Sequence, residues 1–379
     1  MHENDYAAAD FAAAFLHPKL LGCLFFSMPQ LCFSGIAEVM LKEKTGFNLK
    51  GMVITMISKN KITFEKFSEK HIDEAVKLAL AELEAERTHC PDLPCEDFSK
   101  HLTGILYWLS SQLFGKAALC DGKLVGYLIF AGPWDGFFGD VKGVFSPLGG
   151  SAFSYEYENR GRLASMIFAS VAEEFVKQGV FSCALSRYAH DEETAKSFIL
   201  NGFGIRCSDA VRKISTLDLQ NNSCGVVFKE LPADKFDAVE RLQRGLHKHL
   251  AGAPVFIPSE NFEDWFENWI KRETMRIFAA ETDGRIIGFI SIDDNAENFI
   301  TEHDSMKNIC GAYFDVNYRG KGIAQNLLSF IANTLKADGI THLGVDCETL
   351  NPTALNFWGK YFESYTYSFV RRIDERVEL

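Results

Sequence analysis

The chain has 379 residues, 47% of them hydrophobic and 24% charged, and its formal net charge at pH 7 is -12. This length exceeds what one hydrophobic core usually spans and therefore predicts two domains. An acidic chain is a poor partner for nucleic acid, whose phosphates require a basic surface, and it suits cationic small molecules better. The ten cysteines include no CxxC pair, so we expect no metal site and interpret them as reduced thiols of a cytoplasmic protein rather than a disulfide framework.

The N-terminal stretch has the pattern of neither a membrane anchor nor a signal peptide. Its apolar residues 20–37 contain Pro29 near their middle and fall short of the roughly 20 residues that a span needs. Three acidic residues stand where a signal peptide would be basic: Glu3, Asp5 and Asp10. Recognisable domain pattern begins near Ile62. We therefore expect no membrane contact and interpret residues 1–56 as a leader that is disordered or not native.

A segment of the first half recurs in the second half about 160 residues later. Residues 120–127 and 282–289 both have the pattern of an Asp-Gly hairpin between apolar strands. Further on, Arg160-Gly161-Arg162 matches Arg319-Gly320-Lys321 in the same order. The repeat predicts two similar domains, residues 57–220 and 225–379.

Each Arg-Gly element is followed by apolar residues at steps of four, which places them on one face of a helix. These residues are Leu163, Ile167, Val171 and Phe175 in the first copy, and Ile323, Leu327, Ile331 and Leu335 in the second. A glycine and a short apolar strand follow each helix, at 180–185 and 342–347. Helices alternating with strands in this way predict an α/β fold with helices packed on a mixed sheet.

The turn from Arg319 to Gly322 lies between a predicted buried strand, 308–314, and the predicted helix that begins at Ile323. Two glycines there let a ligand approach backbone N–H groups at a helix start, and two flanking cations add positive charge. This arrangement predicts a pyrophosphate site. A P-loop would need Gly-Lys-Ser/Thr, and a dinucleotide fingerprint would need glycine at Gln325, so neither motif fits. The remaining alternative is a glycine-rich turn with surface cations.

With Arg319, Gly322 and Ala324 the turn resembles the signature Arg/Gln-x-x-Gly-x-Gly/Ala of the GNAT superfamily of N-acetyltransferases. The resemblance implies, in each copy, a mixed, mostly antiparallel twisted sheet flanked by helices. It also implies acetyl-CoA as co-substrate and no metal. It places the pantetheine arm on Ala312, Tyr313 and Phe314, and the pyrophosphate on Gly320, Lys321, Gly322, Ile323, Ala324 and Gln325. The family's next element, Asn-x-x-Ala-x-x-x-Tyr, begins at Asn351 but has Trp358 in place of the tyrosine.

The first copy departs from this signature. Leu163 occupies the position of the close-approach glycine, and Glu192 and Ile199 stand where Asn and Tyr are expected. A Cβ at that position obstructs a pyrophosphate. We therefore interpret the first copy as a degenerate GNAT-like domain that lines the substrate cleft or forms a subunit contact, which leaves a homodimer open.

Amine acetylation requires a deprotonated amine, and in this family a carboxylate on the strand after the phosphate-loop helix usually provides the base. By resemblance that residue is Asp346, which strand alternation places on the face opposite Leu343 and Val345. A solvated carboxylate or an ion pair is the alternative. An indole N–H is no general acid, so we assign proton donation to Tyr361, with Tyr365 and Tyr367 at the start of the last strand as alternatives, unless the thiolate leaves unprotonated. His247 and His249 do not share a helix face and are interpreted as surface residues.

The sequence thus predicts a tandem N-acetyltransferase that transfers acetyl from acetyl-CoA to a primary amine of a small molecule or peptide. Because no nucleophilic Cys or Ser motif is present, we expect direct transfer in a ternary complex. The alternative is an acyl-CoA-binding sensor or interaction protein without transferase activity. GNAT acceptors are selected by variable loops, so the sequence indicates the class of acceptor but not its identity.

Overall fold

The computed structural model describes residues 62–217, 225–258 and 261–379, so the predicted leader lies outside the described residues. Both halves have the same succession of elements, except that β4 and β5 of the first half stand where the second half has β11 alone. The first half consists of β1 (Ile62–Lys66), α2 (Ile72–His89), α3 (Ser99–Ser110), β2 (Phe114–Cys120), β3 (Lys123–Trp134), β4 (Lys142–Ser146), β5 (Ser151–Phe153), α4 (Arg160–Val176), β6 (Val180–Tyr188), α5 (Glu192–Leu200) and β7 (Gly204–Lys213). The second consists of β8 (Val227–Leu231), α6 (Glu240–Ala251), α7 (Phe262–Ile270), β9 (Arg276–Thr282), β10 (Arg285–Asp293), β11 (Met306–Phe314), α8 (Ile323–Ala337), β12 (His342–Glu348), α9 (Pro352–Trp358) and β13 (Glu363–Arg372).

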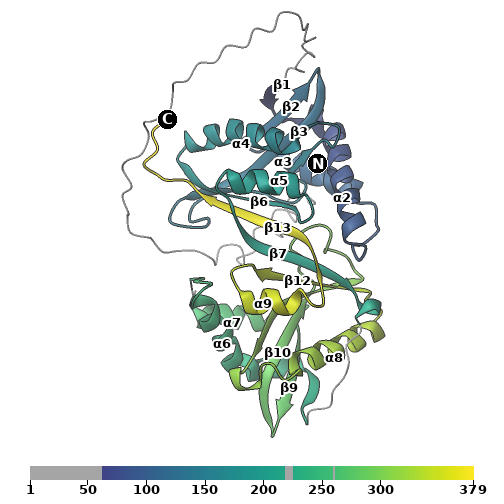
Figure 1. The fold of residues 1–379 in the computed structure, drawn as a ribbon. Helices are drawn as coiled ribbons and strands as arrows, with labels where there is room; N and C mark the ends of the chain where they lie inside the picture. Colours follow the sequence, from purple (N-terminus) through teal and green to yellow (C-terminus); the bar gives the residue numbers. More distant parts are fainter. Residues whose placement is uncertain (1–61, 218–224, 259–260) are drawn as a thin grey trace, which may run out of the picture.

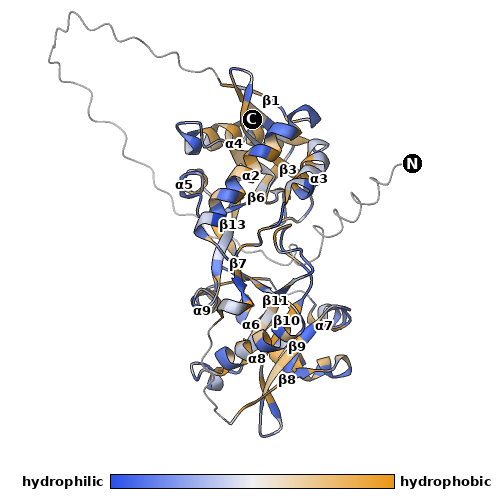
Figure 2. Cartoon of the chain, turned by 90° about the vertical axis from the view of Figure 1, so that its right-hand side faces the viewer, coloured by the Kyte–Doolittle hydropathy of each residue, from blue (hydrophilic) through white to orange (hydrophobic). Residues whose placement is uncertain are grey.

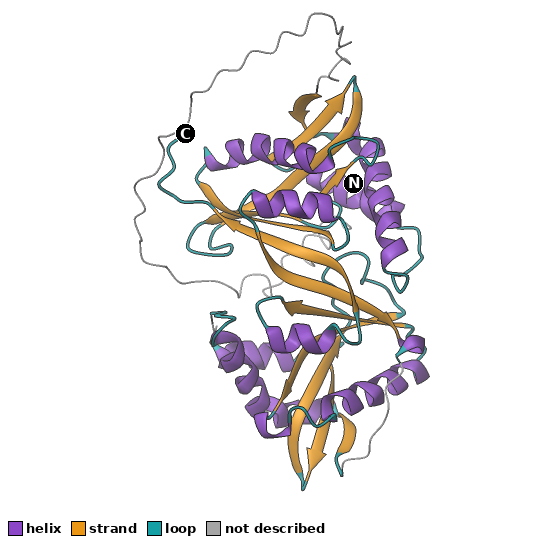
Figure 3. Ribbon diagram, in the orientation of Figure 1, coloured by secondary structure: helices purple, strands orange, loops and turns teal. Residues whose placement is uncertain are grey.

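The strands of the described residues join into one sheet in the order β1-β2-β3-β4-β6-β13-β7-β12-β11-β10-β9-β8, with β5 paired to β3. Two pairs, β4 with β6 and β11 with β12, are parallel, and the others are antiparallel. This confirms the predicted mixed, mostly antiparallel sheet flanked by helices. Figure 3 shows helices on both faces of both halves.

The last strands of the two copies are exchanged. β13, the end of the second copy, lies between β6 and β7, and β7, the end of the first copy, pairs with β12 (Figure 1). The register sets Phe369 opposite Leu185 and Val345 opposite Ala210. The sequence repeat therefore divides the chain into two copies but does not divide the sheet, and the first copy contributes a strand directly beside the second copy's β12.

Four apolar cores fill the space between the sheet and its helices. The predicted helix faces are confirmed, because the apolar residues at steps of four are all buried: Leu163, Ile167, Val171, Phe175, Ile323, Leu327, Ile331 and Leu335. Helices α4 and α5 cover one face of the first half, with α2 and α3 on the other. In the second half α8 and α9 cover one face, and α6 and α7 the other. Figure 2 shows apolar strands between helices with hydrophilic outer surfaces.

Among the described helices, none is both long enough and apolar enough to cross a bilayer. Residues 20–37 lie outside the part of the chain that was searched.

Candidate functional site

Strands β11 and β12 separate halfway along their length. Their parallel pairing runs from Met306 opposite His342 to Ile309 opposite Val345, and within the described residues it stops there. β11 continues to Phe314, paired with β10 alone. A β-bulge marks the point of separation, because the registers on either side leave Cys310 without an opposite residue. The backbone edge of residues 310–314 therefore faces an opening in the sheet.

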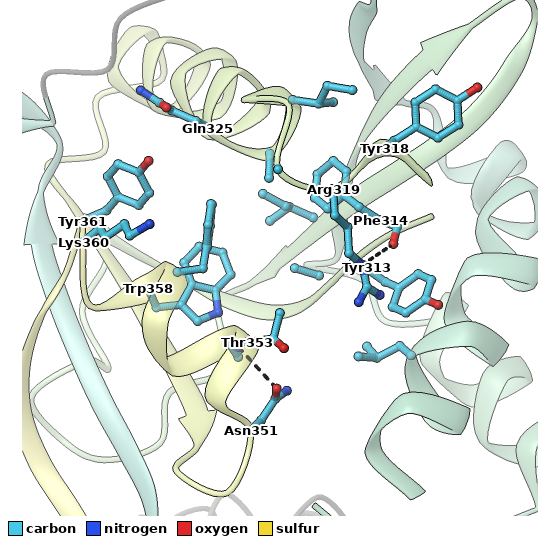
Figure 4. Close-up of a pocket in the computed structure, with 18 of the residues that line it drawn as sticks. Tyr313, Phe314, Tyr318, Arg319, Gln325, Asn351, Thr353, Trp358, Lys360 and Tyr361 are labelled. Atoms are coloured by element: carbon cyan, nitrogen blue, oxygen red, sulfur yellow. Dashed lines mark hydrogen bonds between the residues drawn. The ribbon is translucent and has the colours of Figure 1, made fainter. Parts of the chain in front are cut away.

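A pocket of about 370 Å³ occupies this opening. Most predicted site residues line it: Ala312, Tyr313, Phe314, Arg319, Gly320, Gly322, Ile323, Ala324, Gln325, Asn351 and Tyr361. Lys321 is not among the lining residues, and its ammonium lies 5.3 Å from the ring centre of Tyr318. Asp346 does not line the pocket either. The structure thus brings the predicted phosphate turn, the predicted pantetheine strand and Asn351 around one cavity (Figure 4).

The start of helix α8 is open to the pocket. Gly320 and Gly322 have φ values of +73° and +77°, a left-handed conformation that favours glycine, and a Cβ on either would meet nothing within 4 Å. Gly322 is the N-cap residue of α8 and provides no side-chain cap. The first N–H groups of a helix have no intrahelical partner, so these amides and the helix dipole favour an anion at this point.

Arg319 holds the turn against the strand that precedes it. Its Nε donates to the carbonyl oxygen of Phe314 at 2.9 Å, and its guanidinium lies 4.9 Å from the ring centre of Tyr313. The cation is therefore fixed at the junction between the strand and the helix start, where Figure 4 shows it facing the pocket.

Comparison with known proteins agrees with this geometry. Residues 243–362 match the model of the acetyltransferase (GNAT) family. These residues form a GNAT domain. Its range includes the opening, the turn and Asn351.

One solved structure has the same fold across both copies, and a second is reported with it. A GCN5-related N-acetyltransferase from Sphaerobacter thermophilus is 15% identical, with a TM-score of 0.52 over 84% of this chain and 98% of that one. A tandem GNAT protein from the clavulanic acid biosynthesis pathway is 13% identical, with a TM-score of 0.43 over 82% and 98% of the two chains. A search of curated proteins found no significant match.

The sequence analysis interpreted His249, which lies in the GNAT domain, as a surface residue. Its place at the pocket was therefore not predicted. It lines the pocket from α6, and its Nε2 lies 3.3 Å from Oδ1 of Asn351, the N-cap residue of α9. His247 packs against Trp265, and burial lowers its pKa. The spacing of Leu246 and His249, three residues apart on one helix face, was the signal that could have located this side of the pocket.

The aromatic residues of α9 and its C-terminal end combine core packing with lining, because Phe357, Trp358 and Tyr361 all line the pocket. Trp358 is buried and packs edge-on against Phe357 and Phe362, at centroid distances of 4.8 and 5.6 Å, in agreement with a core role. Tyr361 lines the pocket, and burial raises its pKa. Figure 4 shows Tyr361 beside Lys360, with Trp358 between it and Asn351. Proton donation by Tyr361 stays a prediction.

Asp346 lies at the throat of the opening, one residue beyond the last β11–β12 pair. The alternation predicted for β12 is present, because Leu343 and Val345 belong to the core under α8 and α9 while Asp346 points to the opposite face. On that face it stands opposite Asp209 of β7. Its role as the base stays a prediction. Among the described residues, no group of three or more His, Cys, Asp or Glu could hold a metal ion.

In the first copy the equivalent strand edge is occupied by the protein's own side chains. β5 pairs with β3 as the end of β11 pairs with β10, with Phe153 opposite Gly126 as Phe314 is opposite Gly288. The N–H of Phe153 donates to Glu82 Oε1 at 2.9 Å, and its carbonyl accepts from Arg160 Nε at 3.1 Å. The carbonyl of Ser151 accepts from Arg187 Nη1 at 2.9 Å.

These side chains form a buried ionic cluster of Glu82, Arg160, Arg187 and Asp191. Arg187 contacts Glu82 at 2.7 Å and Asp191 at 2.5 Å, and Arg160 contacts Asp191 at 2.8 Å. Burial alone would raise the pKa of Asp191, but Arg187 and Arg160 outweigh it and lower that pKa to about 2. The cluster fills the space that corresponds to the second copy's opening.

The helix start of the first copy is capped as well. Asn159 Oδ1 accepts from the N–H of Arg162 at 2.8 Å, and Glu193 Oε1 accepts from the N–H of Gly161 at 2.9 Å. Leu163, at the position of Gly322, is fully buried. These contacts agree with an interpretation of this copy as degenerate, which stays a prediction.

The structure also corrects the alignment of the following helix by one residue. The N-cap residue of α5 is Asp191, as Asn351 is of α9, so the counterpart of Asn351 is Asp191 rather than Glu192. Trp358 then corresponds to the buried Phe198 rather than to Ile199.

Proposed function

We propose that the second copy is an N-acetyltransferase domain, which uses acetyl-CoA to acetylate a primary amine of a small molecule or peptide. The observation that carries this proposal is the continuity of one cavity from the uncapped start of α8 to the free edge of β11. A pyrophosphate and an extended pantetheine arm need these two features side by side.

The residues of the pocket suit the parts of this co-substrate. The amides of Gly322 to Gln325 would hold the pyrophosphate, with Arg319 supplying positive charge. The backbone groups of Ala312 and Tyr313 on the edge away from β10 would pair with the amides of the pantetheine arm, as a further strand would. Asn351, held by His249, lies at the same cavity.

The co-substrate supplies an acetyl thioester, whose carbonyl carbon is the electrophile. The chain would supply position and proton transfer. A backbone N–H of the strand 312–314 would polarise the carbonyl, and Asp346 would take a proton from the amine beside the opening. The transfer is direct, in a ternary complex. We place the reaction in the cytoplasm, on a soluble amine rather than on nucleic acid or a membrane.

The test is an assay of the full chain with acetyl-CoA and a panel of amines: spermidine, kanamycin and a lysine-containing peptide. We expect CoA release together with an acetylated product, and Asp346→Asn should reduce kcat about 10²–10⁴-fold while acetyl-CoA binding persists. Asp338→Asn, at the exposed end of α8, is the matched control and should retain activity.

If acetyl-CoA bound but no amine were acetylated, the transferase proposal would be rejected in favour of an acyl-CoA-binding sensor. Full activity of Asp346→Asn would reject the assignment of the base.

A further inference from the structure

The first copy places a carboxylate beside the second copy's candidate base. Because β7 pairs with β12, Asp209 stands directly opposite Asp346 on the same face of the sheet. Directly opposed residues of an antiparallel pair have Cβ atoms about 5 Å apart. The strand exchange is therefore what brings the two carboxylates together.

This pair lies where the sheet opens. Val345, the neighbour of Asp346, makes the last pair with β11, and the bulged Cys310 follows directly on the other strand. Across the opening, Gln243 of α6 is 1% exposed and packs over Gly311. Its Oε1 is buried and has no hydrogen-bond partner among the described residues. A buried carbonyl oxygen without a donor points to a missing N–H group on this face of the sheet.

Asp209 itself is buried and held by uncharged donors. Its carboxylate accepts from Thr366 Oγ1 at 2.5 Å and from Asn298 Nδ2 at 3.2 Å. Asn298 also donates to the hydroxyl of Tyr365 at 2.8 Å. Burial first, and then the charge of Asp346, raise the pKa of Asp209 to about 7.

Further ionisable groups of the described residues stand around the pair. Glu297 precedes β11, while Cys207 and Tyr365 flank Asp209 on β7 and β13. Burial first, and then the charges of acidic neighbours, raise the pKa of Cys207 and of Tyr365. Beside Asp209 on β7, within the described residues, the cation Arg206 is paired with Glu348 at 2.6 Å.

We propose that Asp209, supplied by the first copy, is a positioning residue that acts through Asp346 and makes the two carboxylates a joint proton acceptor for a cationic amine. The inference rests on the proposed function and assigns a task to the degenerate copy. Two carboxylates at this separation cannot both ionise easily, so the pair holds one proton near neutral pH. A base whose pKa lies near neutral pH is suited to deprotonate an alkylammonium.

The proton and electron balance is as follows. The acceptor arrives as an ammonium ion, and one proton passes to Asp346. The nitrogen lone pair then forms the N–C bond to the acetyl carbonyl while the C–S bond breaks and its electrons remain on sulfur. The second proton leaves the nitrogen as the amide forms and passes to the sulfur or to water. Before this step Gln243 Oε1 accepts one ammonium N–H.

The experiment compares the pH dependence of kcat/KM in wild type and two variants. Asp209→Asn removes the opposing charge, so the acidic limb should move to lower pH by about one unit or more. Thr366→Val removes a hydrogen bond that stabilises the charged form of Asp209, so the limb should move to higher pH. A merely structural role for the two residues predicts no such opposite shifts.

A second readout does not depend on turnover. NMR titration of protein labelled with ¹³C-aspartate should show one carboxyl titrating near pH 7 in wild type and its loss in Asp209→Asn, with acetyl-CoA binding retained. Turnover in wild type with the same acidic limb in all three proteins would overturn the inference and leave the proposed function intact. Absence of the titration would overturn it regardless of turnover. Acetyl-CoA binding without acetylation of any amine would overturn both.

Discussion

Arg160 and Arg319 make the same hydrogen bond in the two copies. Arg160 Nε donates to the carbonyl of Phe153 at 3.1 Å, and Arg319 Nε to that of Phe314 at 2.9 Å. The shared bond shows that the two turns follow equivalent strand ends. The surroundings differ: Arg160 is enclosed by Glu82 and Asp191, whereas Arg319 lines a cavity. One arginine position thus serves a filled site in one copy and an open site in the other.

The ionic cluster should be a major source of stability in the first copy. Arg187→Met leaves Glu82 and Asp191 buried with less compensation, and removal of one partner of a buried pair costs about 3–5 kcal/mol. Urea denaturation measures the loss. Lys177→Met, which removes an exposed pair with Glu173, is the control and should cost far less. A loss for Arg187→Met as small as that of the control would contradict the packing described here.

Stability should depend on pH through Asp209. Its pKa rises from 3.8, the value for an exposed aspartate, to about 7 in the folded protein, so the folded state binds the proton more tightly. The resulting stabilisation is fully present below pH 3.8 and is lost as pH rises through 7. Asp209→Asn, which cannot ionise, should therefore gain in Tm relative to wild type between pH 5 and pH 8. A difference in Tm that is constant over this range would refute the assignment.

Trp358 should be dispensable for chemistry. Because it packs between Phe357 and Phe362 and its indole N–H is not an acid, Trp358→Phe should keep most of the turnover. Steady-state kinetics of acetyl transfer, alongside circular dichroism to establish folding, provide the measurement. A thousandfold loss of kcat in a folded variant would show that the indole takes part in the reaction.

Local pattern was enough to predict the repeat, the helix faces and the phosphate turn, because each depends on residues close in sequence. Gly320 and Gly322 require a left-handed backbone, and steps of four from Ile323 require a helix. The exchange of β7 and β13 could not be predicted, since each of these two strands has an apolar pattern that fits either half of the sheet. The proximity of Asp209 to Asp346 follows from that exchange alone.

Two errors have similar causes. His249 was interpreted as a surface residue because its position on the helix was compared with that of His247. Its position was not compared with that of Leu246, with which it shares a helix face. The one-residue shift at Asp191 arose because an N-cap position is defined by its hydrogen bond to Thr194 and not by residue type. The first case was decided by a contact between distant segments, His249 with Asn351, and the second by a local hydrogen bond.

The central claim is that the second copy alone binds acetyl-CoA, and calorimetric titration of the full chain tests it most directly. We expect one site per chain, abolished by Gly322→Glu, whose carboxylate would repel the pyrophosphate. Gly284→Glu is the matched control, because Gly284 also has a left-handed φ, of +71°, in open space but lies in the β9–β10 turn. It should bind as wild type does. Two sites per chain, or one site that survives Gly322→Glu, would contradict the account.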